Sequence, residues 1–170
     1  MYGYRAQSGV LDLGTTASGS VIFALNNPST TKSAFVKRLL AMLGFVGTPA
    51  ATGIDFGICR ATGTAAAGSG NASGSSIAKN GGGPDSFCTV RWGPTPITGL
   101  TPDAPGDFAG AFLNHQIEGA YPVEIIRDDL REQYADEFIL LPSTSLIVIT
   151  RTISIVGSRV AFNVEWAETI

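Results

Sequence analysis

Histidine, cysteine and charged residues are scarce in this chain of 170 residues. It has one histidine, His115, and two cysteines, Cys59 and Cys88, and only 15% of its residues are charged. A single histidine excludes any site that needs two histidine ligands. Both cysteines lie in strand-like segments, where a thiol behaves as a small apolar group, so we expect them to be reduced and buried.

Long apolar segments and a strong charge are also missing. No segment approaches the roughly 20 apolar residues of a membrane span, and the first residues lack the apolar core of a signal peptide. The net charge of −3 lacks the basic excess typical of nucleic-acid-binding proteins. We therefore expect a protein made and folded in the cytoplasm, with neither a membrane nor a nucleic acid as its partner.

Catalytic motifs are absent. Neither the G-x-S-x-G nucleophile elbow nor the G-x-x-x-x-G-K-[ST] phosphate loop occurs in the sequence. One cluster of carboxylates offers oxygen ligands for Ca²⁺, but its spacing is not that of an EF-hand loop. The arginines within it favour a solvated face or ion pairs between subunits. Its acidic members are Asp128, Asp129, Glu132, Asp136 and Glu137. We predict no catalytic residues, no cofactor and no metal site.

The residues that are present predict one β domain. Apolar residues make up 44% of the chain, and Gly, Ser, Thr, Ala and Asn replace many of the charged residues that a free soluble surface would carry. This composition suits a protein that its neighbours cover in part, although a β domain rich in small residues has it too. The length allows a single domain with a substantial core.

The end of the chain shows the clearest strand pattern. Residues 145–168 contain two apolar-alternating runs joined at Gly157 and Ser158, and a type II′ turn requires glycine at its first central position. This turn predicts a hairpin with one buried face. Its predicted pairs are Val156–Arg159, Ile155–Val160, Ile153–Phe162, Arg151–Val164 and Ile149–Trp166.

Further strand-like segments recur between turn residues, in the pattern of a β-sandwich. They are 20–26, 54–61, 86–92, 108–117, 121–126 and 138–141. Residues 31–46 are ambiguous, because their Leu, Ala, Lys and Arg are good helix formers. We interpret 35–46 as a strand, since β-like surroundings override local propensity. Its expected face carries Phe35, Leu39, Leu43 and Phe45.

Two segments lack the apolar content of a strand. Residues 1–18 are expected to form an extended N-terminal arm, and residues 19–170 the β-sandwich domain. Within that domain, residues 62–85 are rich in Gly, Ser and Ala and are expected to form a long, flexible, exposed loop. The arm either inserts into a neighbouring subunit or is an ordinary flexible end. Its candidate contact residues are Tyr2, Tyr4, Leu11 and Leu13.

Arg151 stands out on the predicted hairpin face, which is otherwise apolar. A charge there must be paired or must reach water, because burying it alone costs several kcal/mol. The guanidinium could extend outward to solvent. It could also form a salt bridge across a symmetric subunit contact, with Glu124 or Glu165 as its partner. Arg151 is therefore a further candidate contact residue.

Four short motifs follow one another along the chain. A strand ends in Asn27-Pro28-Ser29 and leads into the basic apolar run 35–48, the turn Leu140-Leu141-Pro142-Ser143 comes much later, and the chain closes on Val164-Glu165-Trp166-Ala167-Glu168. This order resembles a group of small tailed-phage virion proteins that decorate or cement capsids. The resemblance covers only part of the chain and leaves out the predicted loop at 62–85.

The resemblance implies a jelly-roll β-sandwich, a strand over 35–46, and a homotrimer attached to a major capsid protein at the virion surface. It brings no catalytic residues. Our leading hypothesis is therefore an all-β, non-enzymatic structural virion protein that decorates or cements a phage capsid. The alternative is a carbohydrate- or receptor-binding β-sandwich module of a phage tail, in which exposed aromatic residues stack on sugars. Its candidate residues are Trp92, Tyr121 and Tyr134.

Overall fold

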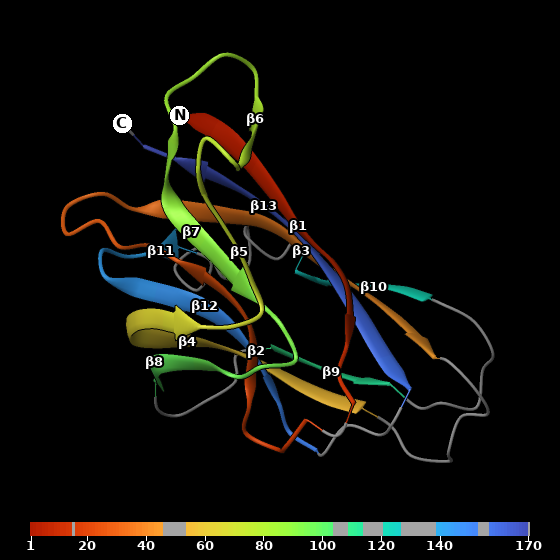
Figure 1. Ribbon diagram of the computed structural model, residues 1–170. Coiled ribbons are helices and arrows are strands. Elements are labelled where there is room, and N and C mark those ends of the chain that lie inside the picture. Colours follow the sequence, from red (N-terminus) through yellow and green to blue (C-terminus); the bar gives the residue numbers. More distant parts are fainter. Residues whose placement is uncertain are drawn as a thin grey trace.

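The computed structural model describes residues 1–14, 16–45, 54–103, 109–113, 121–126, 139–152 and 157–169. Within these ranges the chain forms strands and turns, and no helix that could span a membrane occurs there. The strands make two antiparallel sheets that pack face to face as a β-sandwich (Figure 1). The prediction of an all-β sandwich is confirmed.

Within the described ranges, sheet A has six strands and sheet B has seven. Sheet A consists of β1 (Tyr2–Asp12), β3 (Ala34–Phe45), β6 (Ala78–Asn80), β10 (Tyr121–Ile126), β11 (Ile139–Leu140) and β13 (Ser158–Glu168). Sheet B consists of β2 (Val21–Asn26), β4 (Ile54–Ala67), β5 (Gly70–Gly74), β7 (Ser86–Trp92), β8 (Ile97–Pro102), β9 (Ala109–Leu113) and β12 (Thr144–Thr150). The orders are β10-β3-β13-β1-β6, with β11 also on β3, and β5-β7-β2-β12-β4-β8, with β9 also on β4.

The predicted terminal hairpin is wrong, because β12 and β13 lie in different sheets. β12 runs between β2 and β4, whereas β13 runs between β1 and β3, which occupy both of its edges. Ile149 therefore lies opposite Val21 and Gly57 rather than Trp166. Alternation in the sequence shows which side of a strand is buried, but it carries no information about the partner strand.

The chain crosses from sheet B to sheet A between Thr150 and Ser158. Gly157 has a φ of 88°, the positive value that the predicted turn requires. Val164, the predicted partner of Arg151, lies opposite Ala6 and Leu39 instead. The remaining predicted pairs involve Ile153, Ile155 and Val156, which lie outside the described residues. Of their expected partners, Val160 and Arg159 pair with β1 and β3, and Phe162 pairs with β3.

β1 is a strand where the sequence predicted an arm. It pairs antiparallel with β13 along its length, and its Tyr4, Ala6 and Leu11 side chains are buried. A β-bulge between Gln7 and Val10 shifts the register, so even-numbered residues face the core before the bulge and odd-numbered residues after it. This shift breaks the period of two that identifies a strand in the sequence.

The ambiguous segment 35–46 is a strand, as predicted. β3 lies inside sheet A, with β13 on one side and β10 and β11 on the other. A register shift skips Lys37, so Val36 rather than Phe35 shares the buried face with Leu39. The side chains of Leu43 and Phe45, and Val46 as a whole, lie outside the described residues.

The segment predicted as a long loop, 62–85, contains the second half of β4 and the whole of β5 and β6. Its Ala65, Ala72 and Ile77 side chains are buried, so the segment contributes to the core. Strands built from alanine, glycine and serine have little side-chain apolarity to reveal them in the sequence. The Pro-rich connector after Trp92 also contains a strand, β8, at the edge of sheet B, where proline is tolerated.

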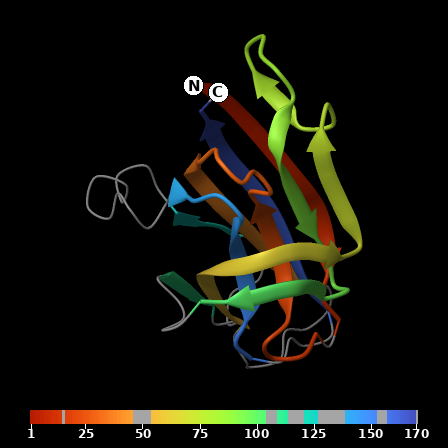
Figure 2. The same cartoon turned by 90° about the vertical axis from the view of Figure 1, so that its left-hand side faces the viewer.

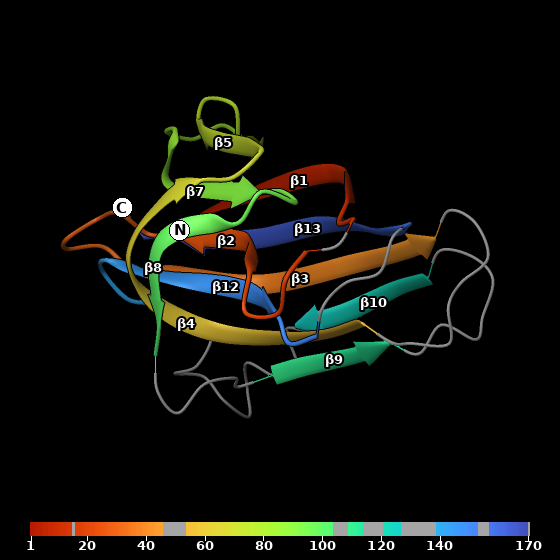
Figure 3. The ribbon, with the colours of Figure 1, turned by 60° about the horizontal axis from the view of Figure 1, so that its bottom comes forward.

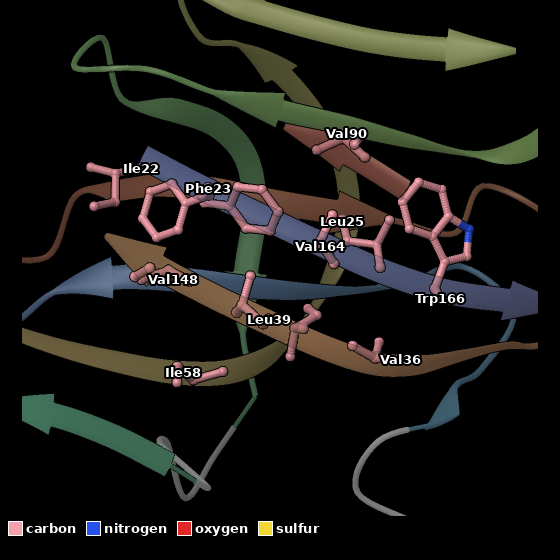
Figure 4. Packing of buried hydrophobic residues seen from close by; sticks show 14 of the residues in the cluster. Ile22, Phe23, Leu25, Val36, Leu39, Ile58, Val90, Val148, Val164 and Trp166 are labelled. Carbon is pink, nitrogen blue, oxygen red and sulfur yellow. The ribbon is translucent and has the colours of Figure 1, made fainter. Parts of the chain in front are cut away.

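Sheet B has an apolar cluster on each of its faces. The main cluster fills the space between the sheets, where Phe23 and Leu25 of β2 meet Val164 and Trp166 of β13 (Figure 4). The second cluster contains residues of sheet B alone, and alternation along β12 places it on the outer face of that sheet. Its members are Val21, Ala24, Cys59, Ala61, Ala65, Ile97, Ile147 and Ile149.

The second half of β4 and its partner β8 cover the second cluster. β4 pairs with β12 and β9 through its first half and with β8 through its second half (Figure 3). Together, the second half of β4 and β8 form a ribbon that runs across the sandwich (Figure 2), where β8 contacts β2. Ala65 and Ile97 of this ribbon, which we call the β4–β8 ribbon, close the cluster from outside.

Two facing glycines allow β4 and β8 to approach at the start of the ribbon. Gly63 has a φ of 105° and Gly99 a φ of 78°. A Cβ atom on Gly63 would lie 2.3 Å from the carbonyl oxygen of Gly99, and a Cβ on Gly99 would lie 2.3 Å from that of Thr64. Both positions therefore require glycine, for conformation and for space.

We expect Gly63→Ala to lower the free energy of unfolding by about 3 kcal/mol or more, because the new methyl group overlaps a backbone carbonyl in addition to straining φ. Gly81→Ala is the matched control, since Gly81 also has a positive φ, of 93°, but no atom lies within 4 Å of its Cβ position. The control should lose only about 1–2 kcal/mol. Urea denaturation measures both losses, and equal losses would contradict this account of the ribbon.

Candidate functional site

A cleft opens where β1 passes β5 and β7, at the edge where the two sheets meet. β1 contacts both of these strands, and the space between them has a volume of about 450 Å³. β1, β5, β6, the turn before β6 and the last residue of β7 all contribute to its walls. The lining residues are Arg5, Ala6, Gln7, Asn71, Ala72, Ser76, Ala78 and Trp92. We call this space the β1–β5 cleft.

Trp92 forms the aromatic wall of the cleft. Its indole is partly buried against the main core, and Gly70 lies directly opposite it on β5. A Cβ atom on Gly70 would lie only 2.2 Å from the indole Nε1, so glycine at this position lets the ring rest on the backbone. Trp92 is one of the three aromatic residues that the sequence predicts to stack on sugars. Tyr134 and the side chain of Tyr121, the other two, lie outside the described residues.

Polar side chains form the rest of the rim. Gln7, Asn71 and Ser76 are exposed, and each carries both donor and acceptor capacity. Arg5 is the one charged residue that lines the cleft. Arg5 lies opposite Glu165, and Glu165 lies opposite Arg38 on its other side, so this cross-strand row carries two positive charges and one negative charge.

A buried carboxylate joins the two sheets at another position. Glu168, at the end of β13, is 3% exposed. It accepts hydrogen bonds from the backbone N–H groups of Phe87 (3.1 Å) and Cys88 (3.2 Å) and from the Ser86 hydroxyl, all in β7. The indole Nε1–H of Trp166 donates a fourth bond, at 2.9 Å. Four donors compensate for the water that the carboxylate loses on burial.

The sequence contains a signal for Glu168 that the prediction did not use. Glu168 continues the buried row of β13, in which every second residue from Val160 to Trp166 faces the core. An acidic residue in register with such a row must find donors inside the protein. Its partners in β7 lie about eighty positions away along the chain, and only the fold shows that they meet.

The predicted contact residues of the N-terminal segment belong mostly to the chain's own core. Tyr4 is 1% exposed; its ring stacks on Trp166 with centroids 5.9 Å apart, and its hydroxyl donates to the Pro84 carbonyl at 3.1 Å. Leu11 and Leu13 are buried as well. These three side chains therefore do not form a contact surface for another subunit. Tyr2 is partly buried and lines a small hollow of about 150 Å³ beside Phe87 and Glu168.

Arg151 directly follows β12, a strand of sheet B. Its backbone N–H donates to the Asp55 carbonyl at 2.8 Å, and its carbonyl accepts a bond from the Ser18 hydroxyl at 2.6 Å. Glu165, one of its two predicted partners, belongs to sheet A. The side chain of Glu124, the other, lies outside the described residues. A subunit contact through Arg151 remains a prediction.

The two cysteines are free and buried, as expected. Cys59 belongs to the second cluster and Cys88 to the main one. No group of three or more His, Cys, Asp or Glu residues that could hold a metal ion occurs in the described part of the chain. His115 and the carboxylates of residues 128–137 lie outside it.

Comparison with known proteins adds no relative. No family model, no curated protein and no solved structure matches this chain.

Glu168→Ala is expected to lower the free energy of unfolding by about 3 kcal/mol or more, because four donors lose their acceptor inside the protein. Glu168→Gln keeps one acceptor oxygen but turns an amide N–H₂ toward a donor, so its loss should be smaller. Glu165→Gln, a partly exposed position on the same strand, should change stability by less than about 0.5 kcal/mol. Urea titrations of the three variants test this order, and a Glu168→Ala loss no larger than that of Glu165→Gln would contradict it.

Cys88 is expected to make the fold less stable at alkaline pH. Burial, and then the nearby Glu168 carboxylate, raise the pKa of its thiol above the ordinary value. The unfolded chain ionises this thiol above about pH 8.5 while the folded chain does not, so stability is fully present below that pH and falls as the pH rises, by about 1 kcal/mol per pH unit. Burial also raises the pKa of Tyr4, so measurements between pH 8 and 9.5 separate the two groups. Cys88→Ala should lose less stability than the unsubstituted chain over this range; an identical loss would show that Cys88 is not responsible.

Proposed function

We propose that this chain is a non-enzymatic structural protein of a phage virion. In this proposal it forms a homotrimer with jelly-roll subunits and attaches to a major capsid protein, so that it decorates or cements the capsid surface. The order of the motifs at 27–29, 140–143 and 164–168 supports the capsid role through the resemblance. The structural observation that carries the proposal is an uncharged surface.

The β4–β8 ribbon exposes a surface without charge. Residues 61–69 and 93–102 contain no Lys, Arg, His, Asp or Glu. The hydroxyl of Ser69 donates to that of Thr95 at 3.1 Å and joins the two segments at one end of the ribbon. The exposed side chains are short, and they belong to Thr62, Thr64, Ala66, Ala67, Ser69, Thr95, Pro96, Thr98, Thr101 and Pro102. Arg91 borders this surface, with its guanidinium bonded to the Ala67 carbonyl at 2.9 Å.

Such a surface favours contact with another protein. Depletion of charged residues is the compositional signal that distinguishes the centre of a protein–protein interface from other surface. β8 is also an edge strand of sheet B, and a free monomer usually protects such an edge with lysine or another charge. Short side chains permit close approach of a flat partner, and no charge has to be desolvated on burial.

The test is the association state of the purified chain and its response to a charge placed on the ribbon. Light scattering coupled to size-exclusion chromatography should give the mass of a trimer. Thr64→Glu and Thr101→Glu should each weaken trimer formation or capsid binding at least tenfold, because the carboxylate must be desolvated in the contact. Thr31→Glu adds the same charge at an exposed position outside the ribbon and should leave both unchanged.

Two further measurements complete this test. The melting temperature of each variant should stay within a few degrees of the unsubstituted chain, since both threonines are exposed. Immunogold labelling should place the chain on the capsid of the virion. A monomer that does not sediment with capsids, or glutamates on the ribbon without effect on either association, would refute the proposal.

A further inference from the structure

We propose that the β1–β5 cleft binds a saccharide that carries a carboxylate group. This inference does not depend on the virion role, because the lining residues of the cleft lie outside the uncharged segments of the β4–β8 ribbon. It assigns a ligand class to the space of about 450 Å³ between β1, β5 and β7.

The size and the aromatic wall of the cleft suit a sugar of one or two rings. Its volume of about 450 Å³ falls within the roughly 300–1,000 Å³ of small-molecule sites in proteins. The Trp92 indole supplies a broad, rigid apolar surface, against which the C–H face of a pyranose ring can pack. Gly70 leaves room for this indole, since any larger residue would collide with it.

The polar groups of the rim match sugar hydroxyl groups. The amides of Gln7 and Asn71 are exposed and form no hydrogen bond with other residues of the described ranges. Each amide offers both a donor and an acceptor in one plane, which is what a hydroxyl group, itself donor and acceptor, can use. The Ser76 hydroxyl is less available to a ligand, because it already forms hydrogen bonds with the backbone of Ser73.

Arg5 favours a sugar with a carboxylate group as the ligand of the cleft. It is exposed and forms no ion pair within the described part of the chain, and its planar guanidinium can hold a carboxylate through two parallel hydrogen bonds. Glu165 lies opposite Arg5 on β13, but it is not among the residues that line the cleft, whereas Arg5 is. Lys79 of β6, next to the cleft, is paired with Asp85 at 2.7 Å. The charge that faces a ligand is therefore positive.

The experiment measures binding of free sugars to the full chain. Glucuronic acid, galacturonic acid and N-acetylneuraminic acid are compared with glucose, galactose and N-acetylglucosamine, by saturation-transfer NMR and calorimetric titration. At least one acidic sugar should bind, at least tenfold more tightly than its neutral counterpart. Arg5→Gln should lower that affinity at least tenfold and Asn71→Ala at least threefold, and Trp92→Phe should lower it less than Trp92→Ala.

The controls separate binding from folding. Arg159→Gln removes the same charge from an exposed position on sheet A outside the cleft, where Arg159 faces Asp12 at 3.8 Å, and should leave the affinity unchanged. Arg5 and Asn71 are exposed, so their variants keep the test valid even if Trp92→Ala fails to fold. The proposal is overturned if none of the acidic sugars binds, if neutral sugars bind equally well, or if Arg5→Gln and Asn71→Ala have no effect.

Discussion

The hydrogen bonds of the Glu168 carboxylate hold the two sheets in a defined position relative to each other. Apolar burial between the sheets is the larger driving force, but it is not directional and tolerates sliding of one layer over the other. The bonds from Ser86, Phe87 and Cys88 tie the end of β13 to the start of β7. β1 pairs with β13 and β5 pairs with β7, so the same carboxylate links the neighbours of the two strands that border the β1–β5 cleft.

The β4–β8 ribbon covers the outer face of sheet B, which is apolar. β12 is buried on both of its faces, and a two-layer sandwich alone would leave Ile147 and Ile149 in water. The ribbon covers them with Ala65 and Ile97, and the glycine pair at 63 and 99 lets the second half of β4 pair closely with β8. The outer surface of the ribbon is uncharged, since residues 61–69 and 93–102 contain no Lys, Arg, His, Asp or Glu.

Local pattern predicted the strands that have ordinary alternation, and failed where the alternation is broken or weak. The predicted bounds of β7 and β10 agree with the structure, and those of β3 differ by one residue in spite of its register shift, because bulky apolar residues mark all three strands. The bulge in β1 moves the buried side chains from even-numbered positions, such as Tyr4, to odd-numbered positions, such as Leu11. The alanine-rich half of β4 has no alternation of apolar and polar residues in its sequence. The terminal hairpin failed for a different reason. Gly157 does permit a tight turn, but the choice between a hairpin and a crossing depends on which strands already occupy the edges of β13, and those strands come from far away in the sequence.

The same argument explains why the β1–β5 cleft could not be predicted. Trp92 was recognised as an aromatic residue able to stack on a sugar, but Arg5 lay in a supposed arm and Asn71 in a supposed loop. The fold brings them together because β1 and β5 are neighbours at the edge where the sheets meet. A contact that buries the β4–β8 ribbon uses other residues than those that line this cleft. Assembly through the ribbon and binding of a sugar in the cleft are therefore compatible roles for a single chain.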